Sequence, residues 1–202
     1  MPYVYVMIVV IDTTIGHKKY LGKLLTYLRR RNAAFAVIRD LDGLRALPVP
    51  PSQIIISGSD LSAIDTRRLP PTLVALLDHV LRARAYRRTR ILGICFGAQY
   101  IAAHLGVQMV HLSDGVAQRI DVHEMGIRPW FFVHDLPIQS TPMRAPIEVL
   151  GTATIGGWLG VIVAFRHKRR PMMGVLFHPE QMRSTYRVLD SFLTIAGGTC
   201  RR

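Results

Sequence analysis

The first half of the chain alternates short apolar runs with longer amphipathic segments. The apolar runs are rich in β-branched residues and predict strands buried on both faces of a parallel sheet, at residues 3–11, 34–38, 53–56 and 90–94. Apolar residues three or four positions apart predict helices at residues 17–32 and 71–84 and in the segment that ends at Leu105. This alternation indicates a doubly wound sheet in which residues 90–94 lie near the centre.

From Val107 onward the pattern changes to short β-like runs separated by turns, at residues 116–122, 129–133, 147–152, 160–166 and 172–177. We expect antiparallel strands added to one side, a return of residues 172–177 to the main sheet, and a closing helix over 184–195. The predicted fold class is α/β: a three-layer sandwich with a mostly parallel central sheet between helices and a small antiparallel addition in the C-terminal half. Because the chain has 202 residues and is 50% hydrophobic, we expect one domain over 1–202.

Basic residues exceed acidic ones by 26 to 13, which gives a formal net charge of +13. They cluster at residues 29–31, 82–90, 167–170 and 201–202. Because these clusters fall at helix ends and in a turn, without interleaved aromatic residues, we favour a solvated basic surface over a nucleic-acid site. An acidic protein partner, docked on the same basic surface, is the other alternative. We find no leader peptide and no apolar run long enough to span a membrane, so we expect a soluble, cytoplasmic protein.

The segment at residues 93–97, GICFG, places a cysteine in a strand-to-helix turn of the nucleophile-elbow type. Glycines two residues on either side suit a turn in which strand and helix approach closely. At a helix N-terminus, free N–H groups would favour the thiolate of Cys95. The alternative is a cysteine buried by packing alone, so a partner base is required. The other cysteine, Cys200, has no role in this interpretation.

A candidate base follows the last predicted strand, in the segment His178-Pro179-Glu180. Residues two apart in an extended segment point the same way, so we expect the carboxylate of Glu180 to orient the imidazole of His178. Taken alone, this tripeptide is more typical of a surface turn than of a catalytic site. Together with Cys95 it completes a nucleophile, base and orienting acid.

The segment 93–99, GICFGAQ, followed by 174–180, GVLFHPE, resembles the class I (triad) glutamine amidotransferases. The resemblance extends over almost the whole chain, from the strand end at Asp12 through 56–58 and 133–135 to the His-Pro-Glu segment. It implies a flavodoxin-like sheet that removes the amide nitrogen of L-glutamine and passes ammonia to a separately encoded synthetase. We expect no metal or other cofactor, and we leave a homo-oligomer open.

The resemblance also implies roles around the triad of Cys95, His178 and Glu180. The oxyanion is expected to meet the backbone N–H groups of Gly58 and Phe96. The other residues expected to bind substrate are Gln99, His134 and Ser59. For Gln99 the alternative is a polar residue on a partly buried helix, and for His134 it is a structural histidine.

Three positions depart from the family pattern. Ser59 stands where a second glycine is usual, Leu176 where a glutamine is usual, and Val133 where a small polar residue precedes the histidine. Two other functions therefore stay open: a hydrolase of γ-glutamyl amides or peptides with the same triad, and a non-catalytic regulatory protein on the same scaffold.

Overall fold

The computed structural model describes residues 7–14, 19–139 and 144–194. Nine strands form one sheet in the order β2-β1-β3-β4-β9-β8-β6-β5, and β7 pairs with β8. The strands are β1 (Ile8–Ile11), β2 (Phe35–Ile38), β3 (Gln53–Ile56), β4 (Arg90–Ile94), β5 (Gln108–Arg119), β6 (Trp130–Ile138), β7 (Ile147–Ile155), β8 (Trp158–His167) and β9 (Met172–Val175). The α-helices are α1 (Lys19–Arg30), α2 (Leu41–Arg45), α3 (Pro71–Arg82), α4 (Phe96–His104) and α5 (Tyr186–Thr194).

The strands β2, β1, β3, β4 and β9 are all parallel, and β4 lies between β3 and β9. Their registers align Ile56 of β3 with Gly93 of β4, and Gly93 with Gly174 of β9. The central position predicted for β4 is therefore confirmed. Because the carboxyl ends of parallel strands meet at one edge, the loops after β3, β4 and β9 converge there.

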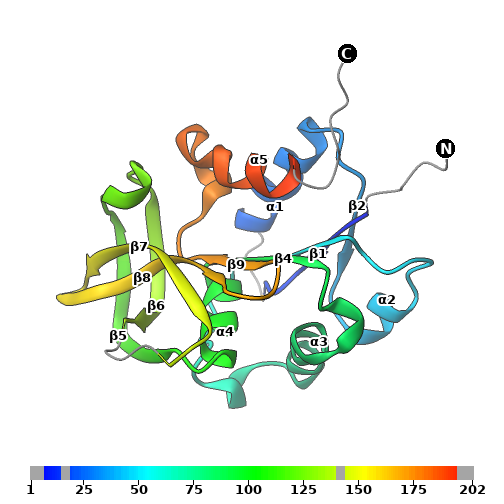
Figure 1. Ribbon diagram of the computed structural model, residues 1–202, viewed down its shortest axis with the longest axis horizontal. Helices are drawn as coiled ribbons and strands as arrows, with labels where there is room; N and C mark the ends of the chain where they lie inside the picture. Colours follow the sequence, from blue (N-terminus) through cyan, green and yellow to red (C-terminus); the bar gives the residue numbers. More distant parts are fainter. Residues whose placement is uncertain (1–6, 15–18, 140–143, 195–202) are drawn as a thin grey trace.

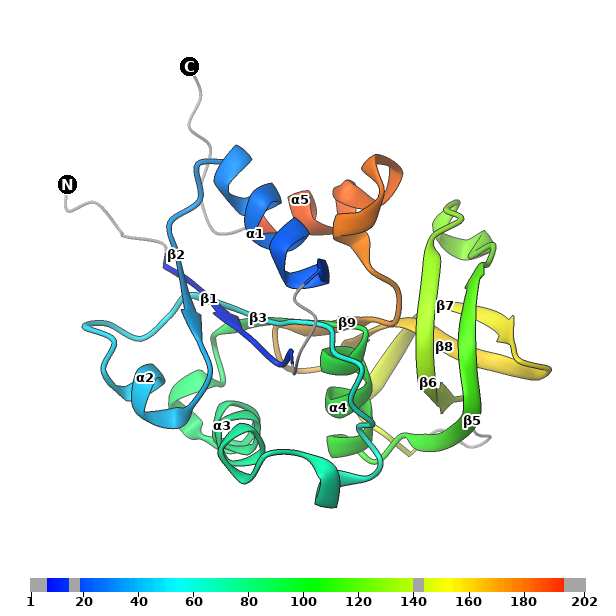
Figure 2. The ribbon, with the colours of Figure 1, turned by 180° about the vertical axis from the view of Figure 1, so that it is seen from behind.

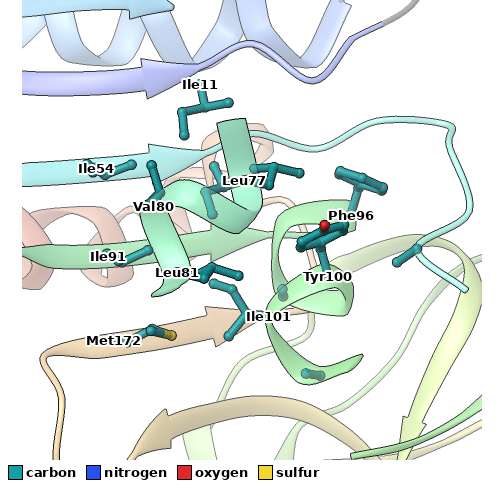
Figure 3. Close-up of a cluster of buried hydrophobic side chains, with 14 of the residues drawn as sticks. Ile11, Ile54, Leu77, Val80, Leu81, Ile91, Phe96, Tyr100, Ile101 and Met172 are labelled. Atoms are coloured by element: carbon teal, nitrogen blue, oxygen red, sulfur yellow. The ribbon is translucent and has the colours of Figure 1, made fainter. Parts of the chain in front are cut away.

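Helices cover both faces of the parallel strands, as Figures 1 and 2 show: α1 and α5 lie on one face, and α2, α3 and α4 on the other. On the second face Leu77 and Val80 of α3 and Ile101 of α4 pack over Ile54 and Ile91 of the sheet (Figure 3). All five side chains are fully or almost fully buried. The predicted three-layer α/β architecture is confirmed.

The C-terminal half adds β5, β6, β7 and β8 as antiparallel strands that extend to one side of the helical layers (Figures 1 and 2). This addition and the return of β9 to the main sheet are confirmed, but several predicted bounds are wrong. The hairpin strands β5 and β6 are longer than the predicted runs 116–122 and 129–133. In β5 a register shift between His111 and Val116 breaks the alternation of polar and apolar positions, and this hid its first residues.

A short helix was also missed. Only five residues long, α2 begins after Asp40, whose carboxylate accepts a hydrogen bond from the Gly43 N–H at 2.7 Å. Such a segment is too short for a helical period to show. Some of the predictions fall outside the described residues: part of the strand at 3–11, the start of the helix at 17–32, and Cys200. In the described part of the chain, no helix is long and apolar enough to cross a membrane.

Candidate active site

Cys95 lies in the turn between the end of β4 and the start of α4. Its backbone has the unusual angles φ 50° and ψ −108°, and its N–H donates to the Val175 carbonyl of β9 at 2.9 Å. A Cβ on Gly93 would lie 2.6 Å from the carbonyl carbon of Gly97, and one on Gly97 would lie 2.4 Å from the Ile56 carbonyl oxygen. The two glycines are therefore required by the close approach of strand and helix, as the sequence pattern predicts.

His178 and Glu180 follow β9 and face each other in a buried position. The Nδ1 of His178 lies 2.7 Å from Oε1 of Glu180, and each residue is only 3% exposed. The expected contact forms, but its predicted backbone is wrong: Glu180 belongs to a 3-10 turn, Pro179–Gln181, and only His178 is extended. The hydroxyl of Thr185 holds this turn by donating to the Pro179 carbonyl at 2.8 Å.

The protonation of His178 is governed by its two ionisable neighbours. Burial disfavours the imidazolium, but the Glu180 carboxylate and the hydrogen-bonded sulfur of Cys95 outweigh it and raise the pKa of His178 to about 10. The Sγ of Cys95 also lies 3.2 Å from the Phe132 carbonyl oxygen, which accepts from the thiol form. Since a thiol is a weak donor, the charge-assisted contact with His178 is the stronger of the two.

The loop after β3 brings Gly58 against the same pair. A Cβ on Gly58 would lie 2.5 Å from Cε1 of His178 and 3.3 Å from the Cβ of Cys95. Thr13, after β1, fixes this loop: its hydroxyl lies 3.0 Å from the Ser57 carbonyl oxygen and 3.1 Å from that of Gly58. The loop, the elbow and the His-Pro-Glu turn therefore meet at one point.

We expect Gly58→Ala to lower kcat/KM for glutamine hydrolysis by roughly 10²-fold, which is the usual effect of disturbing one oxyanion donor. The added methyl would overlap the imidazole of His178, so the loop must move away from Cys95. Gly22→Ala is the matched control, because a Cβ at Gly22 meets nothing within 4 Å. Steady-state ammonia release measures both variants. Equal rates in Gly58→Ala and wild type would contradict this placement.

Gln99 joins α4 to β6 one helical turn after Cys95. Its Nε2 donates to the Asp135 backbone carbonyl at 3.0 Å, and the residue is 3% exposed. Because its amide already binds β6, Gln99 fixes the strand whose Phe132 carbonyl contacts Cys95. Direct contact of Gln99 with substrate stays a prediction.

Asp135 is the residue of this region that the sequence did not single out. It is fully buried, and its Oδ2 accepts from the Ala63 N–H at 2.6 Å and from the Ser62 hydroxyl at 2.9 Å. Its Oδ1 lies 2.7 Å from Nδ1 of His111. Asp135 thus ties β6 to the segment that follows Gly58. The available signal was an acidic residue directly after an apolar strand run.

Asp135→Ala is expected to lower the free energy of unfolding by about 3 kcal/mol, because the buried Ala63 N–H and the partly buried Ser62 hydroxyl lose their acceptor. Urea denaturation followed by circular dichroism measures this change. Asp121→Ala is the control, since Asp121 is exposed and faces Arg128 only at 3.7 Å. A loss for Asp135→Ala as small as that of the control would show that the buried network adds nothing to stability.

The side-chain contacts described for Ser59 and His134 are with residues outside the triad. The Ser59 hydroxyl accepts from the Leu61 N–H at 3.3 Å, within its own loop. The His134 side chain is exposed and covers Gly115 of β5, where a Cβ would lie 2.5 Å from its Cε1. Their roles toward substrate stay predictions. The other two departures from the family pattern, Leu176 and Val133, are 1% and 2% exposed and pack in the core, so apolar residues suit both positions.

This arrangement provides the parts needed for acyl transfer from an amide. It has a cysteine at a helix N-terminus, a histidine in contact with it, and a carboxylate that orients the histidine. Gly58 approaches this group from the loop after β3, and Phe96 is the first residue of α4 after Cys95; their role as oxyanion donors stays a prediction.

Comparison with solved structures supports the fold. A Thermoplasma acidophilum protein assigned as one of the subunits of GMP synthase superimposes with a TM-score of 0.71 at 20% identity, over 96% of this chain and 95% of that one. A glutamine amidotransferase of Thermotoga maritima gives a TM-score of 0.59 at 19% identity, over 94% of this chain and 83% of that one. At such identities the likeness shows a shared fold.

Comparison with curated sequences gives a consistent result. Anthranilate synthase component 2 of Azospirillum brasilense is 25% identical over 191 residues, which is 86% of each chain. Its Mycobacterium tuberculosis counterpart is 28% identical over 136 residues, or 59% of this chain, and the match spans only 55% of that relative's length. The profile of the class I glutamine amidotransferases matches residues 10–194. This chain therefore belongs to the class I glutamine amidotransferase family.

Proposed function

We propose that this chain hydrolyses the side-chain amide of L-glutamine through a cysteinyl thioester and supplies ammonia to a partner synthase. The observation that carries the proposal is the buried contact of His178 with both Cys95 and Glu180 at the carboxyl ends of β4 and β9. Family membership supports the choice of glutamine as substrate.

In the first half of the reaction the Cys95 thiolate attacks the side-chain amide carbon of glutamine. The oxygen of the tetrahedral intermediate becomes negatively charged and meets the N–H groups of Gly58 and Phe96. When the intermediate collapses, the C–N bond breaks and His178 donates its proton to the departing nitrogen. Ammonia leaves, and the glutamyl group stays bound to sulfur as a thioester.

In the second half, His178 removes a proton from a water molecule, which attacks the thioester carbon. The C–S bond breaks, glutamate leaves, and the thiolate returns. Throughout both halves Glu180 holds Nδ1 of the imidazole, so that Nε2 is the atom that exchanges protons with substrate and water. In the net reaction, one water molecule is consumed for each ammonia molecule released.

The ammonia acceptor is a separate synthase component in this proposal. Homologues of this chain are amidotransferase subunits that work with synthase components. The names of these relatives point to two different synthases, anthranilate synthase and GMP synthase. The proposal therefore names a synthase as the partner and leaves open which molecule accepts the ammonia. Gating of glutamine hydrolysis by that partner would prevent wasteful loss of glutamine.

The test is to incubate the chain with L-glutamine and measure ammonia and glutamate, with and without candidate synthase components. We expect equal amounts of both products from the wild type and none from Cys95→Ala. Release of glutamate from γ-glutamyl amides or peptides but not from glutamine would select the γ-glutamyl hydrolase instead. No product from any of these substrates, with or without partners, would select a non-catalytic protein.

A further inference from the structure

Two arginine-rich segments that are far apart in the sequence meet at the amino ends of β4 and β9. The segment 82–90 leads into β4, and 166–171 leads into β9. The Ile91 N–H donates to the Pro171 carbonyl at 2.9 Å, and the Arg170 guanidinium donates to the Leu81 carbonyl at 2.6 Å. We call the cations that these segments bring together the basic pole: Arg84, Arg87, Arg88, Lys168, Arg169 and Arg170.

Little of the charge of the basic pole is compensated: Glu148 interacts with Lys168 at longer range. Neither segment contains Asp or Glu. At the flanks Arg82 pairs with Asp78 at 3.3 Å and Arg166 pairs with Glu148 at 2.8 Å. Within the described ranges, the six cations themselves form no ion pair. Burial and, to a smaller extent, the like charge of Arg87 lower the pKa of Arg170.

A hollow of about 170 Å³ opens beside the pole, and Arg170 is the member of the pole that lines it. The rest of its lining combines Arg90, Arg166 and His167 with apolar side chains such as Met172, Met173 and Phe192. Among the described residues, Nη2 of Arg170 is buried without a hydrogen-bond partner. The Nδ1 of His167 accepts from the backbone N–H groups of Arg169 at 2.9 Å and Arg170 at 3.1 Å, which leaves Nε2 as the donor. Nη2 of Arg170 and Nε2 of His167 are therefore the hydrogen-bond donors that this hollow can offer to an anion, since the Arg90 guanidinium already donates to the backbone of α5.

The residue types in and around the basic pole favour a nucleic acid over an acidic protein as its binding partner. Protein interfaces usually have an apolar or aromatic centre, but none of the exposed large apolar residues of the described chain lies in segment 82–90 or 166–171. Interfaces with nucleic acid are more polar and strongly basic. Tyr86, the aromatic residue of the first segment, is 9% exposed, so it offers no platform for stacking unpaired bases.

We propose that the basic pole binds the phosphate backbone of double-stranded nucleic acid without reading its sequence. The pole lies at the amino end of β4, and Cys95 lies at its carboxyl end, roughly 15 Å away along the strand. Duplex binding and glutamine hydrolysis therefore use opposite ends of the sheet. This proposal departs from the sequence analysis, which favours a solvated basic surface over a nucleic-acid site.

The experiment measures fluorescence anisotropy of a labelled DNA duplex of about 20 base pairs, titrated with the full chain at several salt concentrations. For four or more phosphate contacts, we expect affinity to fall about 10²-fold or more between about 50 and 200 mM salt. The triple variant Arg87→Glu, Arg88→Glu, Arg169→Glu should weaken binding at least about tenfold and reduce the salt slope by about 2 to 3. The three side chains are exposed, so folding should persist.

The matched control is the triple variant Arg119→Glu, Arg128→Glu, Arg183→Glu, which makes the same charge change on exposed arginines outside the pole. Circular dichroism checks the fold of both, and Arg87→Gln, Arg88→Gln, Arg169→Gln replaces the first if it unfolds. Equal weakening by control and pole variants would overturn the assignment to this surface. Displacement of the duplex by polyglutamate at equal charge, or tighter binding of a single strand, would overturn the choice of duplex.

Discussion

Cys95→Ala is expected to abolish ammonia release from L-glutamine, with a fall of at least about 10⁴-fold. Without the sulfur no thioester can form, and the remaining donors can only bind substrate. The fold should persist, because the change removes one atom from a 2% exposed side chain whose backbone bond to Val175 is unaffected. Coupled glutamate detection gives the rate, and a thermal melt in the presence of glutamine reports whether substrate still binds.

Cys200→Ala is the control for the loss of a thiol as such, and it should react like the wild type. If Cys95→Ala kept wild-type activity, another nucleophile would be responsible and the site assignment would be wrong. If both variants lost activity together, the effect could not be attributed to the elbow cysteine.

Glu180→Gln is expected to lower kcat by roughly 10³ to 10⁴, since a neutral amide no longer orients the imidazole or stabilises its charged form. It should also change the pH profile. With Glu180 and Cys95 nearby, the pKa of His178 rises from 6.5 to about 10, so the protonated acid persists until the pH rises through about 10. Without the carboxylate, the alkaline loss of activity should occur at lower pH.

The same shift links His178 to stability. Its pKa is higher in the folded than in the unfolded chain, so this contribution is complete below about 6.5 and is lost as pH rises through about 10. Rates and melting temperatures between these limits check both statements. Glu148→Gln, on an exposed glutamate bound to Arg166, is the control and should leave the profile unchanged. An alkaline limb at the same pH in Glu180→Gln and wild type would show that Glu180 does not hold the imidazolium.

Local patterns in the sequence were enough for the parallel half of the fold except for the five-residue helix α2. The strands β3 and β4 match the predicted runs, and the glycines at 93 and 97 indicated the tight elbow whose contacts the structure contains. The pattern was less informative for β5, where the bulge near Gly115 interrupts the two-residue period. For Glu180 the pattern correctly predicted the contact with His178 but wrongly predicted an extended backbone, because Glu180 lies in the 3-10 turn that begins at Pro179.

The sequence by itself determined the fold class and singled out the candidate nucleophile, its base and the orienting acid, because these depend on short-range periodicity and on two compact motifs. Only the tertiary structure decided what surrounds them. Three contacts join segments whose proximity depends on strand order: Gly58 lies against His178, the Phe132 carbonyl lies against Cys95, and Asp135 binds the loop after β3. Strand order also joins the two arginine clusters into one basic pole, and no local pattern along the chain carries that information.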